Sequence, residues 1–171
     1  MEEGARPPLP GAAEAVAAVR ELEAAAASLA TAESLTGGLI GAALTSVPGA
    51  SSVYRGGAVA YATDLKVRML GVPRGLLEAR GAVAPGVARA MAEGARSELA
   101  ADFGLAVTGV AGPGPQDGRA AGTVFAAVCG RGGLCRVSEF SLTGDRAAIR
   151  AATAEQALRL LRSEVAAITG K

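Results

Sequence analysis

Hydrophobic residues recur at helical spacing in three stretches of the chain. These stretches are the Ala-rich segments 12–27 and 85–101 and the segment 145–168. In the second of them, Val87 and Met91 illustrate the four-residue interval. Side chains at such intervals lie on one face of a helix. The pattern therefore predicts an amphipathic helix in each segment.

Shorter apolar runs, bounded by turn residues, predict five strands between and after the first helices. The runs cover residues 28–32, 57–63, 105–109, 122–129 and 134–141. The last two flank the sequence Arg131-Gly132-Gly133, which is typical of a hairpin. A short helix is expected over 39–45, and another begins near Asp64, which is a suitable capping residue.

Strands that alternate with helices predict a three-layer α/β/α sandwich around a mixed sheet of about five strands. The chain has 171 residues, the length of one ordinary domain. We therefore expect a single domain over residues 12–171. The preceding segment 1–11 contains three prolines and two glycines, which predicts a poorly ordered arm.

The composition excludes several kinds of chemistry. The chain contains no histidine, so Ser-His-Asp triads, Cys-His dyads and histidine-ligated metal sites are all excluded. The net charge is +1 and aromatic residues make up 3% of the chain, which disfavours nucleic-acid binding. Because neither a secretory signal nor a membrane span is recognisable, we expect a cytoplasmic protein.

The pattern around Cys129 and Cys135 favours two unpaired, core-facing hydrophobic residues over a disulfide.

Ser34 lies in the first of four polar segments that carry candidate chemistry. It occupies a predicted strand-to-helix turn, where the hydroxyl is lifted from the sheet and helix N–H groups stabilise negative charge. Such a turn suits a nucleophile, although the Gly-x-Ser-x-Gly sequence of α/β-hydrolases is absent. The alternative is that Ser34 and Thr36 are helix caps and that Gly37 and Gly38 allow tight packing.

Lys66, in the second segment, is a candidate base for Ser34. A partly desolvated lysine with a lowered pKa replaces histidine in Ser-Lys hydrolases. The only other lysine in the chain is Lys171, whereas arginine supplies the remaining basic residues. The alternative is a solvated lysine on a helix. Tyr61 either orients the lysine or the substrate, or is a strand residue in the core.

The third and fourth segments are candidates for anion binding. Residues 108–119 follow a strand and are rich in Gly and Pro, so they either present backbone N–H groups to an oxyanion or phosphate, or form a plain turn. Their spacing is wrong for a dinucleotide-binding fingerprint. In the fourth segment Arg146 suits a phosphate or carboxylate; the alternative is that Asp145 is a helix N-cap with a solvated arginine beside it.

Taken together in chain order, the four polar segments resemble the C-terminal domain family of CinA, whose enzymatic members are nicotinamide-nucleotide amidases. The resemblance runs from about Val16 to the end of the chain, and we expect the stand-alone form of the domain. The matching residues are 32–38, 49–52, 57–66, 70–72, 81–83, 90–95, 108–113, 122–124 and 144–146.

The resemblance implies hydrolysis of the carboxamide of nicotinamide mononucleotide to nicotinic acid mononucleotide and ammonia. It also implies a fold of the anticodon-binding-domain-like class. Ser34 would be the nucleophile, Lys66 the general base, and Tyr61 and Thr108 supporting polar groups. We expect no cofactor and no metal, a small nucleotide as substrate, and a homo-oligomer. The positions expected around the substrate are Thr36, Gly37, Gly38, Ser51, Gly112 and Arg146.

The sequence departs from the family pattern at three places. Leu35 stands where the family usually has Cys, and Thr63-Asp64 replaces the commoner Asn-Glu pair. The loop 114–121 lacks the usual pattern of prolines and charges. Two alternative hypotheses therefore stay open: a non-catalytic nucleotide-binding or competence-associated protein, and an amidase for another small amide.

Overall fold

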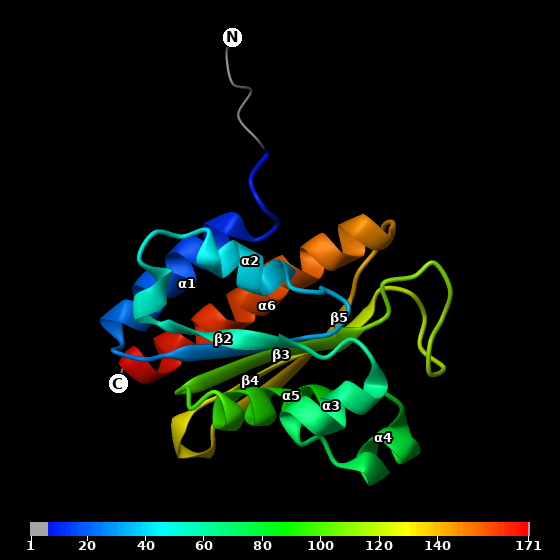
Figure 1. Cartoon of the computed structure of the whole chain (residues 1–171). Helices are drawn as coiled ribbons and strands as arrows, with labels where there is room; N and C mark the ends of the chain where they lie inside the picture. The colour runs from blue at the N-terminus through cyan, green and yellow to red at the C-terminus, as the bar shows by residue number, and fades with distance from the viewer. Residues whose placement is uncertain (1–6, 171) are drawn as a thin grey trace.

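The computed structural model describes residues 7–170. Residues 1–6, most of the arm expected over 1–11, lie outside this range. Within it, helices on both faces of one central sheet form the three layers that the sequence predicts (Figure 1). No helix of the described part combines the length and the apolarity that a membrane crossing requires.

The sheet is mixed and has five strands in the order β2-β1-β3-β4-β5. Strand β1 is parallel to β2 and to β3, whereas β4 is antiparallel to β3 and to β5. The prediction of a mixed sheet of about five strands is therefore confirmed. The strands are β1 (Leu29–Glu33), β2 (Tyr54–Val59), β3 (Phe103–Gly109), β4 (Thr123–Cys129) and β5 (Cys135–Ser141).

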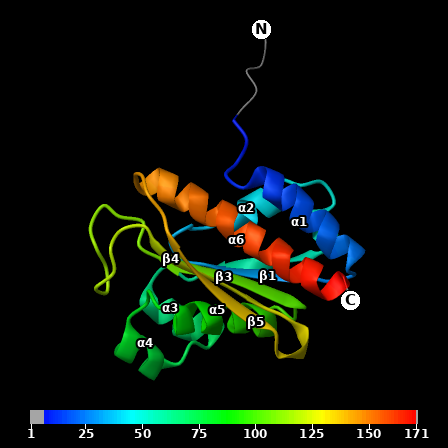
Figure 2. The same ribbon diagram turned by 180° about the vertical axis from the view of Figure 1, so that it is seen from behind.

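Six helices in the described part enclose the sheet from its two faces. Helices α1 (Ala12–Ala24), α2 (Leu39–Thr45) and α6 (Arg146–Thr169) cover one face. Helices α3 (Thr63–Leu70), α4 (Arg74–Arg80) and α5 (Pro85–Glu98) cover the other (Figure 2). Each face has its own hydrophobic core, so β1 is buried along its whole length. This burial explains why its sequence is an unbroken run rather than an alternating pattern.

Helix α5 lies in backbone contact with both β3 and α3. A Cβ atom at Gly104 would stand 1.9 Å from the Ala92 carbonyl oxygen, and one at Gly94 would stand 2.0 Å from the Leu70 carbonyl oxygen. Only glycine allows such a close approach at these two positions. The contact fixes α3, and with it Lys66, against the sheet.

The structure differs from the sequence prediction in two elements on this side of the sheet. Helix α4 was not predicted, because its seven residues are too few to show a period. Asp64 does not cap α3, since the N-cap position is Ala62 and no side chain binds there. By contrast, Asp145 caps α6, as one of the two alternatives for its segment expects, with its carboxylate accepting the Ala148 N–H at 2.8 Å.

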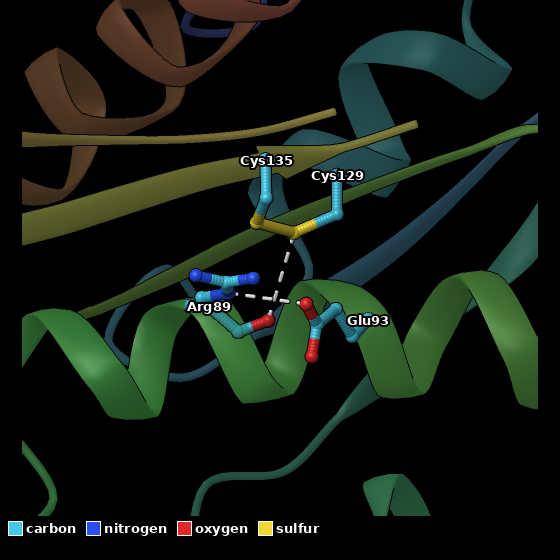
Figure 3. The surroundings of a disulfide bond; sticks show 4 residues. All are labelled: Arg89, Glu93, Cys129 and Cys135. Carbon is cyan, nitrogen blue, oxygen red and sulfur yellow. Dashed lines mark hydrogen bonds and ion pairs between the residues drawn. A yellow bond between two sulfur atoms is a disulfide. The ribbon is translucent and has the colours of Figure 1, made fainter. Parts of the chain in front are cut away.

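The prediction that the two cysteines are unpaired was wrong. Cys129 and Cys135 are bonded in a disulfide that joins β4 to β5 (Figure 3). The hairpin register places them directly opposite each other, with their Cα atoms 4.0 Å apart. Cys129 is nevertheless buried, as a core-facing residue would be.

Candidate active site

A pocket of about 260 Å³ lies at the carboxyl ends of the parallel strands. Open α/β sheets place their ligand crevices at this edge. The loop between β3 and β4, yellow-green in Figure 1, projects from the same end of the sheet. The polar and glycine residues that line the pocket include Ser34, Tyr61, Thr63, Lys66, Thr108, Gly109, Gly112, Gly114, Gln116 and Arg146.

Ser34 is the first residue after β1, and its N–H donates to the Val107 carbonyl of the neighbouring strand at 3.2 Å. The chain then turns sharply through Gly37 and Gly38, whose φ angles of 59° and 104° favour glycine. Within residues 7–170, neither the Leu35 N–H nor that of the next residue donates to a protein acceptor. Of these two residues only Leu35 lines the pocket, so its N–H is the free backbone donor next to Ser34 in the chain.

The Glu33 side chain fixes the turn after Ser34 through hydrogen bonds to backbone N–H groups. Its buried carboxylate accepts hydrogen bonds from the N–H groups of Gly38, Ile40 and Gly41 at 3.0, 3.1 and 2.8 Å. A carboxylate at this position satisfies the orphan donors of a helix N-terminus and interacts favourably with its dipole. The last residue of β1 thus anchors α2 and positions Ser34 between strand and helix.

Lys66 is among the largest fully buried side chains within residues 7–170, with 1% of its surface exposed. Its Nζ donates to Ser34 Oγ at 3.0 Å, to the Ala60 carbonyl at 2.7 Å and to the Tyr61 carbonyl at 3.3 Å. Burial lowers the pKa of Lys66 to about 8, against a smaller opposing effect of the Asp117 carboxylate. A useful fraction of the amine is therefore neutral near physiological pH.

Thr108 and Asp117 hold the same peptide segment from two sides. Thr108 Oγ1 donates to the Ala82 carbonyl at 2.8 Å, and Asp117 Oδ2 accepts the Ala82 N–H at 2.8 Å. Ala82 lines the pocket in the connection between α4 and α5. The two bonds fix this wall, and Asp117 docks the β3–β4 loop against it.

Arg146 joins two other parts of the pocket wall. Its guanidinium donates to the Gly112 carbonyl and to the Tyr61 hydroxyl, at 2.8 and 2.7 Å. Arg146 and Tyr61 are both exposed, so the guanidinium edge faces solvent at the pocket mouth. Such an edge suits an anionic group of a ligand.

Comparison with known proteins places the chain in a family. Residues 12–165 match the family model described as the CinA C-terminal domain. The chain belongs to this family. A CinA-like protein of Frankia casuarinae is 50% identical over 142 residues, and a putative competence-damage inducible protein of Geobacillus kaustophilus is 46% identical over 140 residues. These alignments cover 83% and 82% of the chain but 33% and 34% of the relatives, so the chain spans about a third of their length.

Two solved CinA-family structures share the fold of this CinA-family domain. The competence/damage inducible protein CihA from Agrobacterium tumefaciens has a TM-score of 0.87 at 37% identity, covering 93% of this chain and 98% of that one. A CinA superfamily protein from Klebsiella pneumoniae 700603 has a TM-score of 0.87 at 32% identity, covering 91% and 98%. The α/β architecture is therefore that of the family.

Not every expected site residue of this CinA-family domain lines the pocket. Thr36, Gly37 and Gly38 lie in the turn behind Ser34. Thr36 is fully buried, and Arg150 donates to its carbonyl at 2.9 Å. Ser51 precedes β2 and lines a separate hollow at the opposite end of the sheet, so the structure does not bring it to Ser34.

Two contributors to the site were missed at the sequence level, Glu33 and Asp117. Both act through backbone N–H groups, which no residue pattern displays. Asp117 and Gly118 have φ angles of 51° and 70°, and Gln116 pairs with Arg119 across them. An Asp-Gly pair is a strong signal for such a tight turn, so the sequence could have indicated the turn at Asp117, although not the contact of its carboxylate with Ala82.

Proposed function

We propose that this chain is an amidase that hydrolyses the carboxamide of nicotinamide mononucleotide to nicotinic acid mononucleotide and ammonia. The observation that carries the proposal is the buried contact of 3.0 Å between Lys66 Nζ and Ser34 Oγ. In a chain without histidine, a lysine with a lowered pKa is the group suited to activate a serine.

The first step transfers the Ser34 proton to the neutral Lys66 amine while Oγ attacks the carboxamide carbon. The negative charge that forms on the carbonyl oxygen is stabilised by backbone N–H groups. We assign this role to the Leu35 N–H, because Leu35 lines the pocket next to Ser34 and its N–H has no protein acceptor within residues 7–170. Lys66 then returns the proton to the leaving nitrogen, and ammonia departs from an acyl-Ser34 ester.

The second step uses water in place of serine. Neutral Lys66 accepts a proton from water, and the hydroxide attacks the ester carbon. Collapse of the intermediate releases the carboxylic acid, and Ser34 Oγ takes back the proton. The Ala60 and Tyr61 carbonyls hold the lysine in place through both steps, since they accept its N–H groups.

A nucleoside monophosphate is the substrate class whose negative phosphate matches the positive charge at the pocket mouth. Arg146 presents its guanidinium beside Tyr61 and the glycine-rich segment around Gly112. Arginine and free backbone N–H groups are the usual ligands of a phosphate. We assign Arg146 to this anionic end, with the carboxamide directed towards Ser34.

Release of ammonia from nicotinamide mononucleotide by the purified chain tests the proposal. We expect turnover by the wild type and a loss of at least about 1000-fold in S34A and in K66M. Ser97 is exposed on α5, so S97A serves as the matched control with unchanged turnover.

Normal turnover in S34A or K66M would contradict the dyad. Calorimetric binding of the nucleotide without turnover by the wild type would support a binding protein instead. A panel of other small amides, tested in the same way, separates a nucleotide amidase from an amidase of different specificity.

A further inference from the structure

Three potential metal ligands gather at the end of the sheet opposite the Ser34 pocket. Cys129 is the last residue of β4 and pairs with Gly104 near the beginning of β3. Cys135 begins β5, and Glu93 lies on α5, which packs across this part of the sheet (Figure 3). The group therefore shares no residue with the proposed catalytic site.

The ligand atoms of these residues already lie close together. The two Sγ atoms and a carboxylate oxygen of Glu93 are all within 4.8 Å of one another. Cys129 and Cys135 stand directly opposite in the β4–β5 register, so their side chains share one face of the sheet. That face is turned towards α5, where Cys129 Sγ contacts the Arg89 carbonyl at 3.8 Å.

Two thiolates and a carboxylate are a ligand set that Zn²⁺ accepts. A tetrahedral ion with Zn–S bonds of roughly 2.3 Å holds its two sulfurs roughly 3.8 Å apart. In the disulfide the two sulfurs are bonded to each other and cannot act as thiolate ligands at this spacing. The disulfide must therefore be reduced before an ion binds. Glu93 is exposed and Cys135 is half-buried, so water has access to the fourth position.

The charge of the surroundings suits a divalent cation. The Arg89 guanidinium pairs with Glu93 at 3.1 Å between Nε and Oε1. The three anionic ligands carry a charge of −3 when both thiols are deprotonated, which a divalent ion and Arg89 balance together. Arg89 thus remains as a partner of the coordinated carboxylate, the arrangement that orients metal ligands in proteins.

We propose that the reduced chain binds one Zn²⁺ ion through Cys129, Cys135 and Glu93, and that the disulfide excludes it. A dithiol reductant supplies the two electrons and two protons that open the disulfide, and itself becomes a disulfide. The ion then displaces the two thiol protons as it binds. The site clamps β4, β5 and α5 together and takes no part in the amidase reaction.

The test is a titration of the chain with Cd²⁺, after reduction by dithiothreitol and removal of the reductant without oxygen. We expect a sulfur-to-cadmium charge-transfer band that saturates at one ion per chain and disappears on addition of Zn²⁺. C135S removes the band, and E93Q raises the Kd for Zn²⁺ by at least about tenfold. Glu98 is exposed on the same helix, so E98Q is the matched control.

The unreduced chain provides a folded control with the same sequence, and it is expected to give no band. A reduced chain without a band overturns the proposal. An E93Q variant with the wild-type Kd also overturns it, because the site would then consist of the two thiols alone. Circular dichroism of each variant verifies that a lost band reflects lost ligands rather than lost folding.

Discussion

At the scale of single residues, the protonation state of Lys66 controls the proposed reaction. Only the neutral amine accepts the Ser34 proton, and burial places the pKa of Lys66 at about 8. We therefore expect kcat/KM for ammonia release to rise with pH and to level off above an apparent pKa near 8. A rate that is flat between about pH 6 and pH 9 would argue against lysine as the base.

The Asp117 carboxylate raises the pKa of Lys66, opposing the effect of burial. In D117N the amide oxygen still accepts the Ala82 N–H, but the charge is gone. We expect the pKa of Lys66 to fall, so the rising limb of the pH–rate profile moves to lower pH while KM changes little. A pH series of initial rates measures both quantities.

Asp64 provides the control for this experiment. It is an exposed acid on α3, two residues before Lys66 in the chain, and it does not contribute to the pKa shift of the lysine. D64N is expected to leave the profile in place. Equal shifts in D64N and D117N would show a general effect of net charge rather than a specific action of Asp117.

The sequence singles out those candidate site residues whose chemistry is visible in their type. Ser34 and Lys66 stand out because histidine is absent and lysine is rare. The contact between them is 3.0 Å long and joins residues 32 positions apart. Glu33 and Asp117 were not found, because their partners are backbone N–H groups whose positions depend on the folded chain.

At the scale of elements, the contact between α5 and α3 positions the lysine. We expect G94A to destabilise the chain by about 1–3 kcal/mol, because its Cβ would overlap the Leu70 carbonyl and push α3 away. Turnover should fall as well, since α3 carries Lys66. Urea unfolding and ammonia release measure the two effects.

Gly86 on the same helix provides the comparison. The nearest atom to a Cβ there is a flexible side-chain carbon of Leu76 at 3.4 Å. G86A is therefore expected to change the free energy of unfolding by less than about 1 kcal/mol, in the stabilising direction. If G94A and G86A behaved alike, the contact between α5 and α3 would not hold Lys66 in place.

The hydrogen bonds between the Glu33 carboxylate and the N-terminus of α2 are tested separately. Removing the charge of Glu33 in E33Q weakens its bonds to the α2 N-terminus, and we expect a loss of about 1–3 kcal/mol in unfolding free energy. Glu139 on β5 is exposed and makes no ion pair within residues 7–170, so E139Q is the control. Unchanged stability in E33Q would contradict the anchoring role.

Elements whose limits are marked by turn or capping residues were predicted well, and elements without such marks were not. The helix over 39–45 has the predicted limits, and the closing helix differs by one residue at each end. Strand β2 was expected over 57–63 but covers Tyr54–Val59, because apolar residues continue past the strand into the link before α3. The start of the strand was missed because it contains Gly56 and Gly57, and glycine is uncommon in strands.

At the scale of the whole molecule, the buried lysine makes stability depend on pH. Its pKa is 10.5 in an unfolded chain and about 8 in the folded one, so the unfolded state binds more protons between these values. The free energy of unfolding therefore rises with pH through this window. From pH 7 to pH 10 we expect a gain of about 2–3 kcal/mol from Lys66.

Comparison with K66M isolates this contribution, because the other titrating groups are common to both chains. We expect the unfolding free energy of the wild type minus that of K66M to be higher by that amount at pH 10 than at pH 7. Urea titrations at the two pH values measure it. A constant difference would mean that the lysine keeps an ordinary pKa in the folded protein.

The uneven packing of the pocket wall has a consequence for directed evolution. At the end of β3 a Cβ at Gly109 would stand 2.7 Å from the Thr123 carbonyl oxygen, whereas a Cβ at Gly114 would meet nothing within 4 Å. Gly114, Pro115 and Gln116 line the pocket from an exposed loop. For the proposed amidase, we expect a library that randomises these three positions and keeps Ser34 and Lys66 to yield variants that accept other amides.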